Sequence, residues 1–370
     1  MKVPFLQSIL ENRLYVMLLA AVIGIFVARL IYDTVSTHDR KMRPLLIGSV
    51  VNISLLALIW ACENAFQSSG WFPAAVAWIP QESFLPLSIV LIVIAIIRRN
   101  ALCTWINGFA AVFVGGILMG AHFTSPAAVP QSETVTAMTI DVDHWKDGAK
   151  PVADTIVDEK PTVVCLQDSQ PDGGAGQPLE DLRKALPGYH FIHDGQMTIG
   201  SIDKIEERSS TPLSPGPSDS PALVATVYGK NRPFTVVDFC LMPCDTSRAM
   251  HDPTGYFAQF THDRDAQSKA LLNAVESLHG PVLACGDFNG PPQVSGSQIL
   301  SKKLQDAFEQ SGTGYGFTAP ANVPIERTDR VLVSAGVTAS SVSTQPTTAL
   351  THLPVLAQVQ IPTEMSTAQR

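Results

Sequence analysis

The sequence predicts an α/β or α+β sandwich domain preceded by a membrane region of four transmembrane helices. The chain has 370 residues, which is long enough for two domains. Long apolar stretches dominate roughly the first third of the chain. From Thr134 onwards, short segments with strand patterns alternate with segments of helical periodicity. We therefore expect a membrane domain over residues 1–122, a linker over 123–133, the sandwich domain over 134–362 and a tail over 363–370.

Four stretches of the membrane domain have the length and apolar composition of bilayer-spanning helices. They cover residues 14–31, 45–61, 82–97 and 102–122. A soluble helical bundle would need polar outer faces. Charged residues are almost absent from the interior of these stretches, Arg29 being the exception, so the sequence favours a membrane location over a soluble bundle.

The basic residues in the loops predict the orientation of these spans. Residues 40–43, after the first span, and residues 98–99, after the third, carry the loop arginines and lysines, whereas residues 62–81 contain none. The positive-inside rule therefore places the first and third loops in the cytoplasm. We expect a multi-pass protein of the cell (inner) membrane whose C-terminal domain, beginning after His122, is extracytoplasmic.

Local patterns predict the elements of the second half in order. Alternating β-branched residues predict a strand over 135–140, and a continuous apolar run predicts a buried strand over 162–166. Apolar residues at helical spacing predict helices over 145–159, 179–186 and 264–279. Further strands are expected over 189–192, 197–199, 222–228, 234–241, 330–334 and 355–361, and a Ser- and Pro-rich loop over 209–221.

One predicted strand ends in an unusual group of polar residues. Residues 281–292 read Pro-Val-Leu-Ala-Cys-Gly-Asp-Phe-Asn-Gly-Pro-Pro, which predicts a buried strand that stops where the glycine and prolines begin. Asp287 and Asn289 lie two positions apart, so in an extended backbone they point the same way. An Asx-rich turn is the alternative interpretation. Active sites of α/β proteins lie at such carboxyl ends of strands.

Polar residues stand at other predicted strand ends as well. Asp141 and Asp143 follow the first strand, Asp168 follows the second, and Asp329 and His352 precede the last two. Each alone could be a helix cap, a turn residue or a surface ion-pair partner. Together, carboxylates, a carboxamide and a histidine suit a hard divalent cation such as Mg²⁺ and the hydrolysis of a phosphate ester.

The order of these segments resembles the endonuclease/exonuclease/phosphatase superfamily over residues 134–361, and the resemblance implies a four-layer α/β sandwich. The segments that carry it are residues 139–143, 161–168, 236–241, 264–267, 286–289, 327–333 and 351–355. The resemblance implies that Asp287 polarises the attacking water and that Asn289 orients the phosphate. It also implies that Asp329 pairs with His352, which contacts the scissile phosphate.

The same resemblance indicates a metal site with altered residues. Asp141, Asp143 and Asp168 are the expected ligands of Mg²⁺ or Mn²⁺. The family usually has Asn at the place of Asp141, Glu at the place of Asp168, Asp at the place of Thr351 and His at the place of Cys240. We expect Asp141 to restore the charge that Thr351 removes, and Cys240 cannot act as a general acid as a histidine does.

The six cysteines are not expected to form a disulfide framework. Cys62 and Cys103 lie in apolar, membrane-type segments. Cys165 and Cys285 lie in predicted buried strands, where a free cysteine behaves as a small apolar residue. Only Cys240 and Cys244 are near neighbours. Such a pair could bind metal or form a strained bridge, but without a second pair it is a weak indication.

The sequence therefore predicts a membrane-anchored, metal-dependent phosphoesterase acting outside the cytoplasm. Its expected partners are the lipid bilayer and a phosphate-containing small molecule or lipid-linked substrate, either a phosphodiester, a phosphomonoester or a lipid-linked pyrophosphate. The formal net charge of −8 argues against nucleic acid as a partner. The competing hypothesis is a catalytically degenerate domain that binds a phosphorylated ligand or a protein partner, because Thr351 and Cys240 replace the usual Asp and His.

Overall fold

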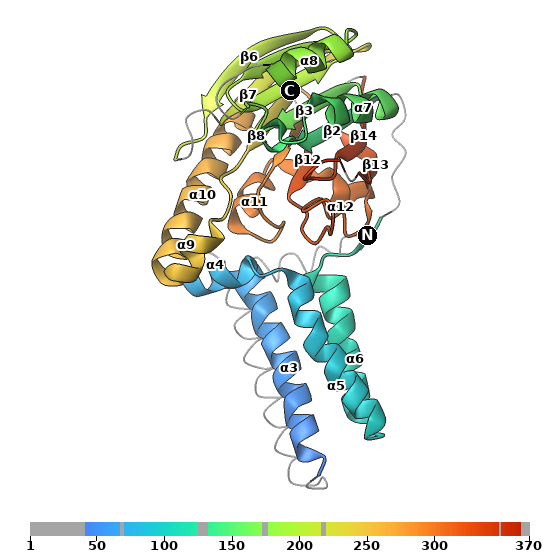
Figure 1. Cartoon of the computed structure of the whole chain (residues 1–370), viewed down its shortest axis with the longest axis vertical. Helices are drawn as coiled ribbons and strands as arrows, with labels where there is room; N and C mark the ends of the chain where they lie inside the picture. Colours follow the sequence, from blue (N-terminus) through green and yellow to red (C-terminus); the bar gives the residue numbers. More distant parts are fainter. Residues whose placement is uncertain are drawn as a thin grey trace. The chain divides into compact units, whose positions relative to one another are not determined.

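The computed structural model describes residues 41–66, 70–124, 132–171, 177–215, 220–347 and 349–363. The chain divides into two compact units. The first consists of Met1–Ala121 with Pro253–Ala258, and the second of His122–Asp252 with Gln259–Arg370. Figure 1 labels helices and strands of both units where there is room.

The first unit contains three helices that run alongside one another: α3 (Arg43–Ala61), α5 (Leu85–Ile97) and α6 (Ala101–Phe113) (Figure 1). Both α3 and α6 end in π-helical turns, which cover Cys62–Phe66 and Val114–Leu118. A short helix α4 (Trp71–Ala77) and a 3₁₀ turn (Gln81–Phe84) connect α3 to α5. Their outward-facing residues are largely apolar, as expected of helices that meet lipid rather than water.

The predicted count of four spans is not confirmed. Among the described residues, Arg43–Asn64 and Ala101–Leu118 are long and apolar enough to cross a membrane, and the pair Trp71–Ala77 with Gln81–Ile97 is bent by 95°. Counting that pair as one span gives three. Pro80, which precedes the 3₁₀ turn, cannot continue a helix because it lacks an N–H. The span predicted over residues 14–31 lies outside the described residues.

Buried polar side chains connect the three long helices. Asn52 of α3 donates from Nδ2 to Ser88 Oγ of α5 at 3.0 Å and to Asn107 Oδ1 of α6 at 3.3 Å. Asn107 in turn donates to Ser49 Oγ at 2.7 Å. Such interhelical hydrogen bonds hold apolar helices together where the hydrophobic effect contributes little.

The second unit contains two six-stranded mixed sheets. The first sheet has the strand order β13-β14-β2-β3-β5-β4, with bounds Thr338–Thr344, Val355–Pro362, Ser132–Asp141, Val163–Gln167, Met197–Ser201 and His190–Asp194. The second has the order β10-β12-β9-β8-β7-β6, with bounds Leu304–Asp306, Asp329–Ser334, Val282–Asp287, Pro233–Cys240, Pro221–Tyr228 and Ile205–Pro212. A two-stranded sheet pairs β1 (His122–Phe123) with β11 (Thr313–Gly314).

Helices cover the outer faces of the two sheets, so the unit has four layers (Figure 1). Apolar residues of both sheets pack together between them. Helices α7 (Ala149–Glu159) and α8 (Gln177–Ala185) pack on the outside of the first sheet. Helix α10 (Pro253–Glu276) and α11 (Ser295–Leu300) pack on the outside of the second. The predicted α/β sandwich is thus confirmed.

Several element boundaries differ from those expected. Residues 209–212, predicted as loop, belong to the edge strand β6, whose mostly exposed polar residues carry no apolar pattern. The helix predicted from residue 145 begins at Ala149, because Gly148 adopts a φ of 78° just before it. The helix predicted over 264–279 is α10, which begins at Pro253. Helices α9 (Thr246–His251) and α12 (Ala307–Ser311) and strands β10 and β13 were not predicted.

The strand register brings polar ends from both sheets to one edge of the sandwich. In the first sheet β2 runs parallel to β3, and Asp141 lies opposite Gln167. In the second sheet β8 runs parallel to β9, and Cys240 lies opposite Asp287. Strand β12 runs antiparallel to β9 and begins where β9 ends, so Asp329 also lies opposite Asp287.

Candidate active site

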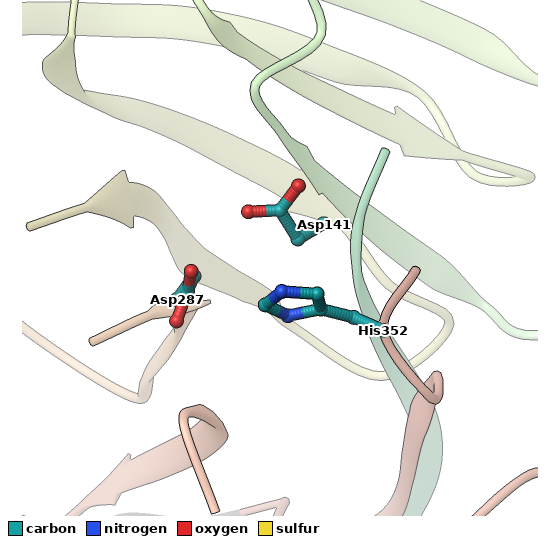
Figure 2. A group of neighbouring side chains, drawn as sticks. All are labelled: Asp141, Asp287 and His352. Carbon is teal, nitrogen blue, oxygen red and sulfur yellow. The ribbon is translucent and has the colours of Figure 1, made fainter. Parts of the chain in front are cut away.

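Three side chains from different elements converge at this edge. Figure 2 shows Asp141 at the end of β2, Asp287 at the end of β9 and His352 on the loop before β14. Their ligand atoms lie within 4.8 Å of one another. Asp141 and Asp287 are buried and His352 is partly buried, so the group forms at a boundary between the protein core and the solvent.

A second group shares Asp141 with the first. The ligand atoms of Asp141, Asp168 and Cys240 also lie within 4.8 Å of one another. Asp168 follows β3 with a φ of 48°, which turns the chain out of the sheet. Its backbone carbonyl accepts a hydrogen bond from the His144 N–H at 2.9 Å. The structure thus brings Asp168 beside Asp141, which also belongs to the group with Asp287 and His352.

Asp143 lies outside both groups. Its backbone N–H donates to Asp141 Oδ1 at 2.7 Å, and its own φ is 42°. Its carboxylate, which is 40% exposed, lies 3.5 Å from Lys146 Nζ. The expectation that Asp141 and Asp143 share one face assumed an extended backbone. The turn that Asp141 closes breaks that alternation, so the structure does not bring Asp143 to the cluster.

Asp287 and Asn289 form the same kind of turn. The Asn289 N–H donates to Asp287 Oδ1 at 2.6 Å, and Asn289 has a φ of 47°. The two side chains therefore do not point the same way by strand alternation, as we expected. Both interpretations of this segment hold in part: it is an Asx turn, and it ends beside the clustered carboxylates.

The amide of Asn289 links the ends of the two parallel strands. Its Nδ2 donates to Leu241 O at 3.0 Å and contacts Cys240 Sγ at 3.2 Å. Both amide hydrogens thus point toward β8 rather than into open space. The role of Asn289 in orienting a phosphate stays a prediction.

Asp329 and His352 form a close pair. His352 Nδ1 lies 2.9 Å from Asp329 Oδ2, which also accepts from Thr328 Oγ at 3.0 Å. Burial disfavours the charged imidazole, but the charge and hydrogen bond of Asp329 outweigh it and raise the pKa of His352 to about 11. Burial likewise acts to raise the pKa of Asp329, but the His352 charge and hydrogen bond hold it below its ordinary value. The pair is therefore a carboxylate and an imidazolium at neutral pH.

The His352 charge only partly offsets burial and repulsion at the other carboxyls of the cluster. Burial and the neighbouring Asp287 charge raise the pKa of Asp141 to about 8. Burial and the Asp329 charge raise the pKa of Asp287 to about 7, and burial and the Asp141 charge raise that of Asp168 to about 7. Burial and mutual repulsion thus make it unfavourable for all three carboxyls to be ionised at once.

Two buried carboxylate oxygens of the cluster are not hydrogen-bonded. Among the residues that the structure describes, Asp287 Oδ2 and Asp329 Oδ1 have no partner, although the other oxygen of each carboxylate has one. A buried polar atom without a partner costs about 1–3 kcal/mol. An unpaired oxygen at the centre of a polar cluster indicates a site for a ligand, an ion or a water.

Cys240 and Arg264 lie at this site, although we expected no catalytic or ligand role for either from the sequence. Burial and the Asp168 charge raise the pKa of the Cys240 thiol well above its ordinary value. Arg264 of α10 donates to the carbonyls of Met242 and Phe288, the latter at 2.6 Å. One guanidinium thereby ties the segments that follow β8 and β9 together. In the sequence, Arg264 begins residues 264–267, one of the segments that carry the family resemblance, but no role was expected of it.

A buried polar bridge connects the two sheets beneath the site. Gln167 of β3 donates to Asp238 Oδ1 of β8 at 2.6 Å and accepts from Thr139 Oγ at 3.0 Å. The Thr198 N–H reaches Asp238 Oδ2 at 3.2 Å. Sequence reasoning missed this bridge because Gln167 and Asp238 lie in different predicted strands and no local pattern relates them.

Sequence and structure comparisons agree on one group of proteins. A model of the Endonuclease/Exonuclease/phosphatase family matches residues 138–351. No curated protein matches the chain. The fold resembles that of a humanized TDP2 from D. rerio with 14 mutations, at 17% identity and a TM-score of 0.50, covering 61% of this chain and 98% of that one.

Two further solved structures have similar folds. D. rerio TDP2 complexed with a single-strand DNA product shares 16% identity at a TM-score of 0.50, covering 61% of this chain and 99% of that one. A mannosyl-6-phosphatase of Bacteroides thetaiotaomicron shares 15% identity at a TM-score of 0.48, covering 61% of this chain and 99% of that one. At such identities the likeness concerns the fold alone.

Proposed function

Because this chain belongs to the endonuclease/exonuclease/phosphatase family, we propose that it is a membrane-anchored, metal-dependent phosphoesterase with its active site outside the cytoplasm. Members of this family are hydrolases that act on phosphate esters, and they generally depend on a divalent metal ion. The observation that carries the proposal is the convergence of Asp141, Asp287 and His352 within 4.8 Å, with His352 held by Asp329.

The residues at the site fit a divalent cation. Asp141 and Asp168 offer carboxylate oxygens from neighbouring strand ends, and oxygen ligands suit Mg²⁺ or Mn²⁺. Asp287 Oδ2 is buried without a partner, which a cation or its ligands would satisfy. A bound ion would offset charge on the phosphoryl oxygens of the substrate. Asp143, which we expected as a ligand, would reach the ion only by breaking its contact with Lys146.

Asp287 is the proposed base that polarises the attacking water. Its Oδ1 accepts the Asn289 N–H, which fixes the plane of the carboxylate. Asp287 Oδ2 then remains as a hydrogen-bond acceptor with a fixed orientation. A water bound to Oδ2 would transfer its proton to the carboxylate as it attacks the phosphate. The raised pKa of Asp287, about 7, gives the carboxylate the basicity that this task needs.

His352 is the proposed group that contacts the scissile phosphate. Asp329 engages Nδ1 of the imidazole, so the other nitrogen, Nε2, is the one available to the substrate. A protonated ring in this position would donate a hydrogen bond to a phosphoryl oxygen and stabilise the charge that develops on it. Asp329 is a positioning residue that holds the ring in place and keeps it charged.

The apolar helices of the chain suggest the class of substrate. Only residues 119–131 separate the last apolar helix segment, which ends at Leu118, from β2. A phosphoesterase tethered so closely to membrane helices is suited to a lipid-linked phosphate or pyrophosphate. A phosphodiester or phosphomonoester of a small molecule is the other candidate. The net charge of −8 disfavours nucleic acid.

The test uses the full chain, purified in detergent and freed of metal. Hydrolysis is measured on a model phosphodiester, a model phosphomonoester and a polyprenyl pyrophosphate, each with Mg²⁺ and with Mn²⁺. We expect metal-dependent release of product from at least one substrate. Absence of metal-stimulated hydrolysis of all three would leave the competing hypothesis, a non-catalytic domain that binds a phosphorylated ligand or a protein partner. Thr351 and Cys240 are the residues that favour that alternative.

Asp168→Asn is expected to raise the Mg²⁺ or Mn²⁺ concentration needed for half-maximal hydrolysis by at least about tenfold. Asp168 offers its carboxylate to the group that contains Asp141, whereas Asp143 faces Lys146. Asp143→Asn is therefore the matched control and should change that concentration by less than about twofold. Metal titrations of the reaction rate measure both. An equal effect of the two substitutions would contradict the ligand assignment drawn from the structure.

A further inference from the structure

Cys240 lies where the apolar core between the sheets meets the clustered carboxylates. It is the last residue of β8, and the register sets it opposite Asp287 across the parallel pair. Its Sγ lies within 4.8 Å of the ligand oxygens of Asp141 and Asp168. The group Asp141, Asp168 and Cys240 is called the sulfur triplet below.

The sulfur of Cys240 also accepts a hydrogen bond. Asn289 Nδ2 lies 3.2 Å from Sγ, and the second amide hydrogen is held by Leu241 O at 3.0 Å. Donors of this kind commonly support a ligating atom from outside the metal shell, fixing its orientation and stabilising its negative form. Asn289 thus supplies what a coordinated thiolate requires.

An independent observation points to a ligand at the same place. Asp287 Oδ2 is buried and, within the described part of the chain, has no hydrogen-bond partner. Asp141 belongs both to the sulfur triplet and to the group with Asp287 and His352, so the Asp287 carboxylate lies beside the triplet rather than in a separate region. Figure 2 shows the Asp141 and Asp287 carboxylates beside the His352 imidazole.

The geometry of the sulfur triplet fits a tetrahedral ion. Zn²⁺ binds thiolate sulfur at about 2.3 Å and carboxylate oxygen at about 2.0–2.2 Å. Tetrahedral angles then place the ligand atoms roughly 3.4–3.7 Å apart. The triplet atoms lie within 4.8 Å of one another, so small side-chain shifts would bring them to these separations. Three protein ligands would leave a fourth position open for water or substrate.

We propose that Asp141, Asp168 and Cys240 form a thiolate-containing site that binds Zn²⁺ and similar ions in preference to Mg²⁺. The inference rests on the metal position of the proposed function, but it does not require hydrolysis. Mg²⁺ takes oxygen ligands in near-octahedral geometry, whereas a soft sulfur ligand favours Zn²⁺ or Co²⁺. The cysteine that replaces the usual histidine would thus change the metal preference of the centre instead of removing its activity.

Cobalt spectroscopy of the metal-free full chain in detergent tests this proposal directly. A thiolate bound to Co²⁺ gives a charge-transfer band in the near ultraviolet that oxygen ligands do not give. We expect the band to saturate at one Co²⁺ per chain, to disappear on addition of equimolar Zn²⁺, and to persist in a large excess of Mg²⁺. Absence of a thiolate band in the wild-type chain overturns the proposal.

Cys240→Ser should remove the band and weaken Zn²⁺ binding by at least about 100-fold, with little change in Mg²⁺ binding. Cys244→Ser is the matched control, because Cys244 is near in sequence, is less buried and belongs to neither ligand group. It should retain both the band and the Zn²⁺ affinity. A band that survives in Cys240→Ser, or that is lost in Cys244→Ser, assigns the thiolate elsewhere and overturns the proposal.

Zinc X-ray absorption of the wild-type chain keeps the proposal testable if Cys240→Ser does not fold. We expect one sulfur at about 2.3 Å from the zinc, with oxygen atoms as its other neighbours. A zinc shell that contains no sulfur would contradict the proposal. These measurements contain no substrate, so they separate the two proposals. Hydrolysis without zinc–sulfur coordination would defeat the sulfur triplet alone, and coordination without hydrolysis would defeat the phosphoesterase alone.

Discussion

Asp287→Asn is expected to lower the rate of phosphate ester hydrolysis by about 1,000-fold, a typical value for loss of a general base. The substitution keeps the size of the side chain and an oxygen that can accept the Asn289 N–H. It removes the negative charge at Oδ2, the buried atom that the structure leaves without a partner. The effect should therefore appear in kcat far more than in KM, as measured with the substrate that the wild-type chain hydrolyses best.

The fold should survive this change. The pKa of Asp287 is raised to about 7 by burial and by Asp329, so a neutral side chain relieves repulsion inside the protein. The unfolding temperature of the metal-free variant should equal or exceed that of the wild type. Asp147→Asn, at an exposed position, is the matched control and should hydrolyse normally. Activity of Asp287→Asn within tenfold of the wild type would exclude Asp287 as the base.

The strand ends of the site could be predicted from local sequence. Val163–Gln167 and Val282–Asp287 are continuous apolar runs in which every residue is buried, and a polar residue after such a run marks where a strand leaves the core. Parallel neighbours then bring those ends together. This is why Asp141, Asp168 and Asp287 could be named in advance.

Side-chain direction at those ends could not be predicted in the same way. Alternation assumes an extended backbone, and each aspartate that ends a strand closes a turn with the residue two positions on. The positive φ values of Asp143 and Asn289 reverse the expected directions. Asp143 therefore faces Lys146, and Asn289 reaches back to β8. Short polar residues tolerate this backbone conformation, so their presence alone did not reveal it.

Contacts between the two sheets could not be predicted from local sequence patterns at all. The Gln167–Asp238 bridge and the approach of Cys240 to Asp168 join residues about 70 positions apart. Nothing in either segment specifies its partner, because the partner is chosen by the packing of the sheets. The edge strands β6 and β13 were difficult to recognise in the sequence for another reason. They are partly exposed and polar, so they lack the apolar run by which the central strands were recognised.

Gly286→Ala is expected to lower the free energy of unfolding of the second unit by about 3 kcal/mol or more. Gly286 lies in β9, directly opposite Phe239 of the parallel strand β8. A Cβ at this position would lie 2.1 Å from Phe239 O and 3.0 Å from the Phe239 ring. A backbone carbonyl cannot rotate away as a flexible side chain can, so β8 and β9 must separate to relieve the overlap.

That separation would also disturb the site, because Asp287 and Cys240 are the next residues along these two strands. Gly286→Ala should therefore lose hydrolysis and weaken thiolate coordination of Co²⁺ even below its unfolding temperature, and peptides of β8 and β9 should exchange amide hydrogens faster. Gly188→Ala is the matched control: a Cβ there meets nothing within 4 Å, so stability should change by less than about 0.5 kcal/mol. A Gly286→Ala chain as stable as that control would mean that the two strands are not packed as closely as the structure has them.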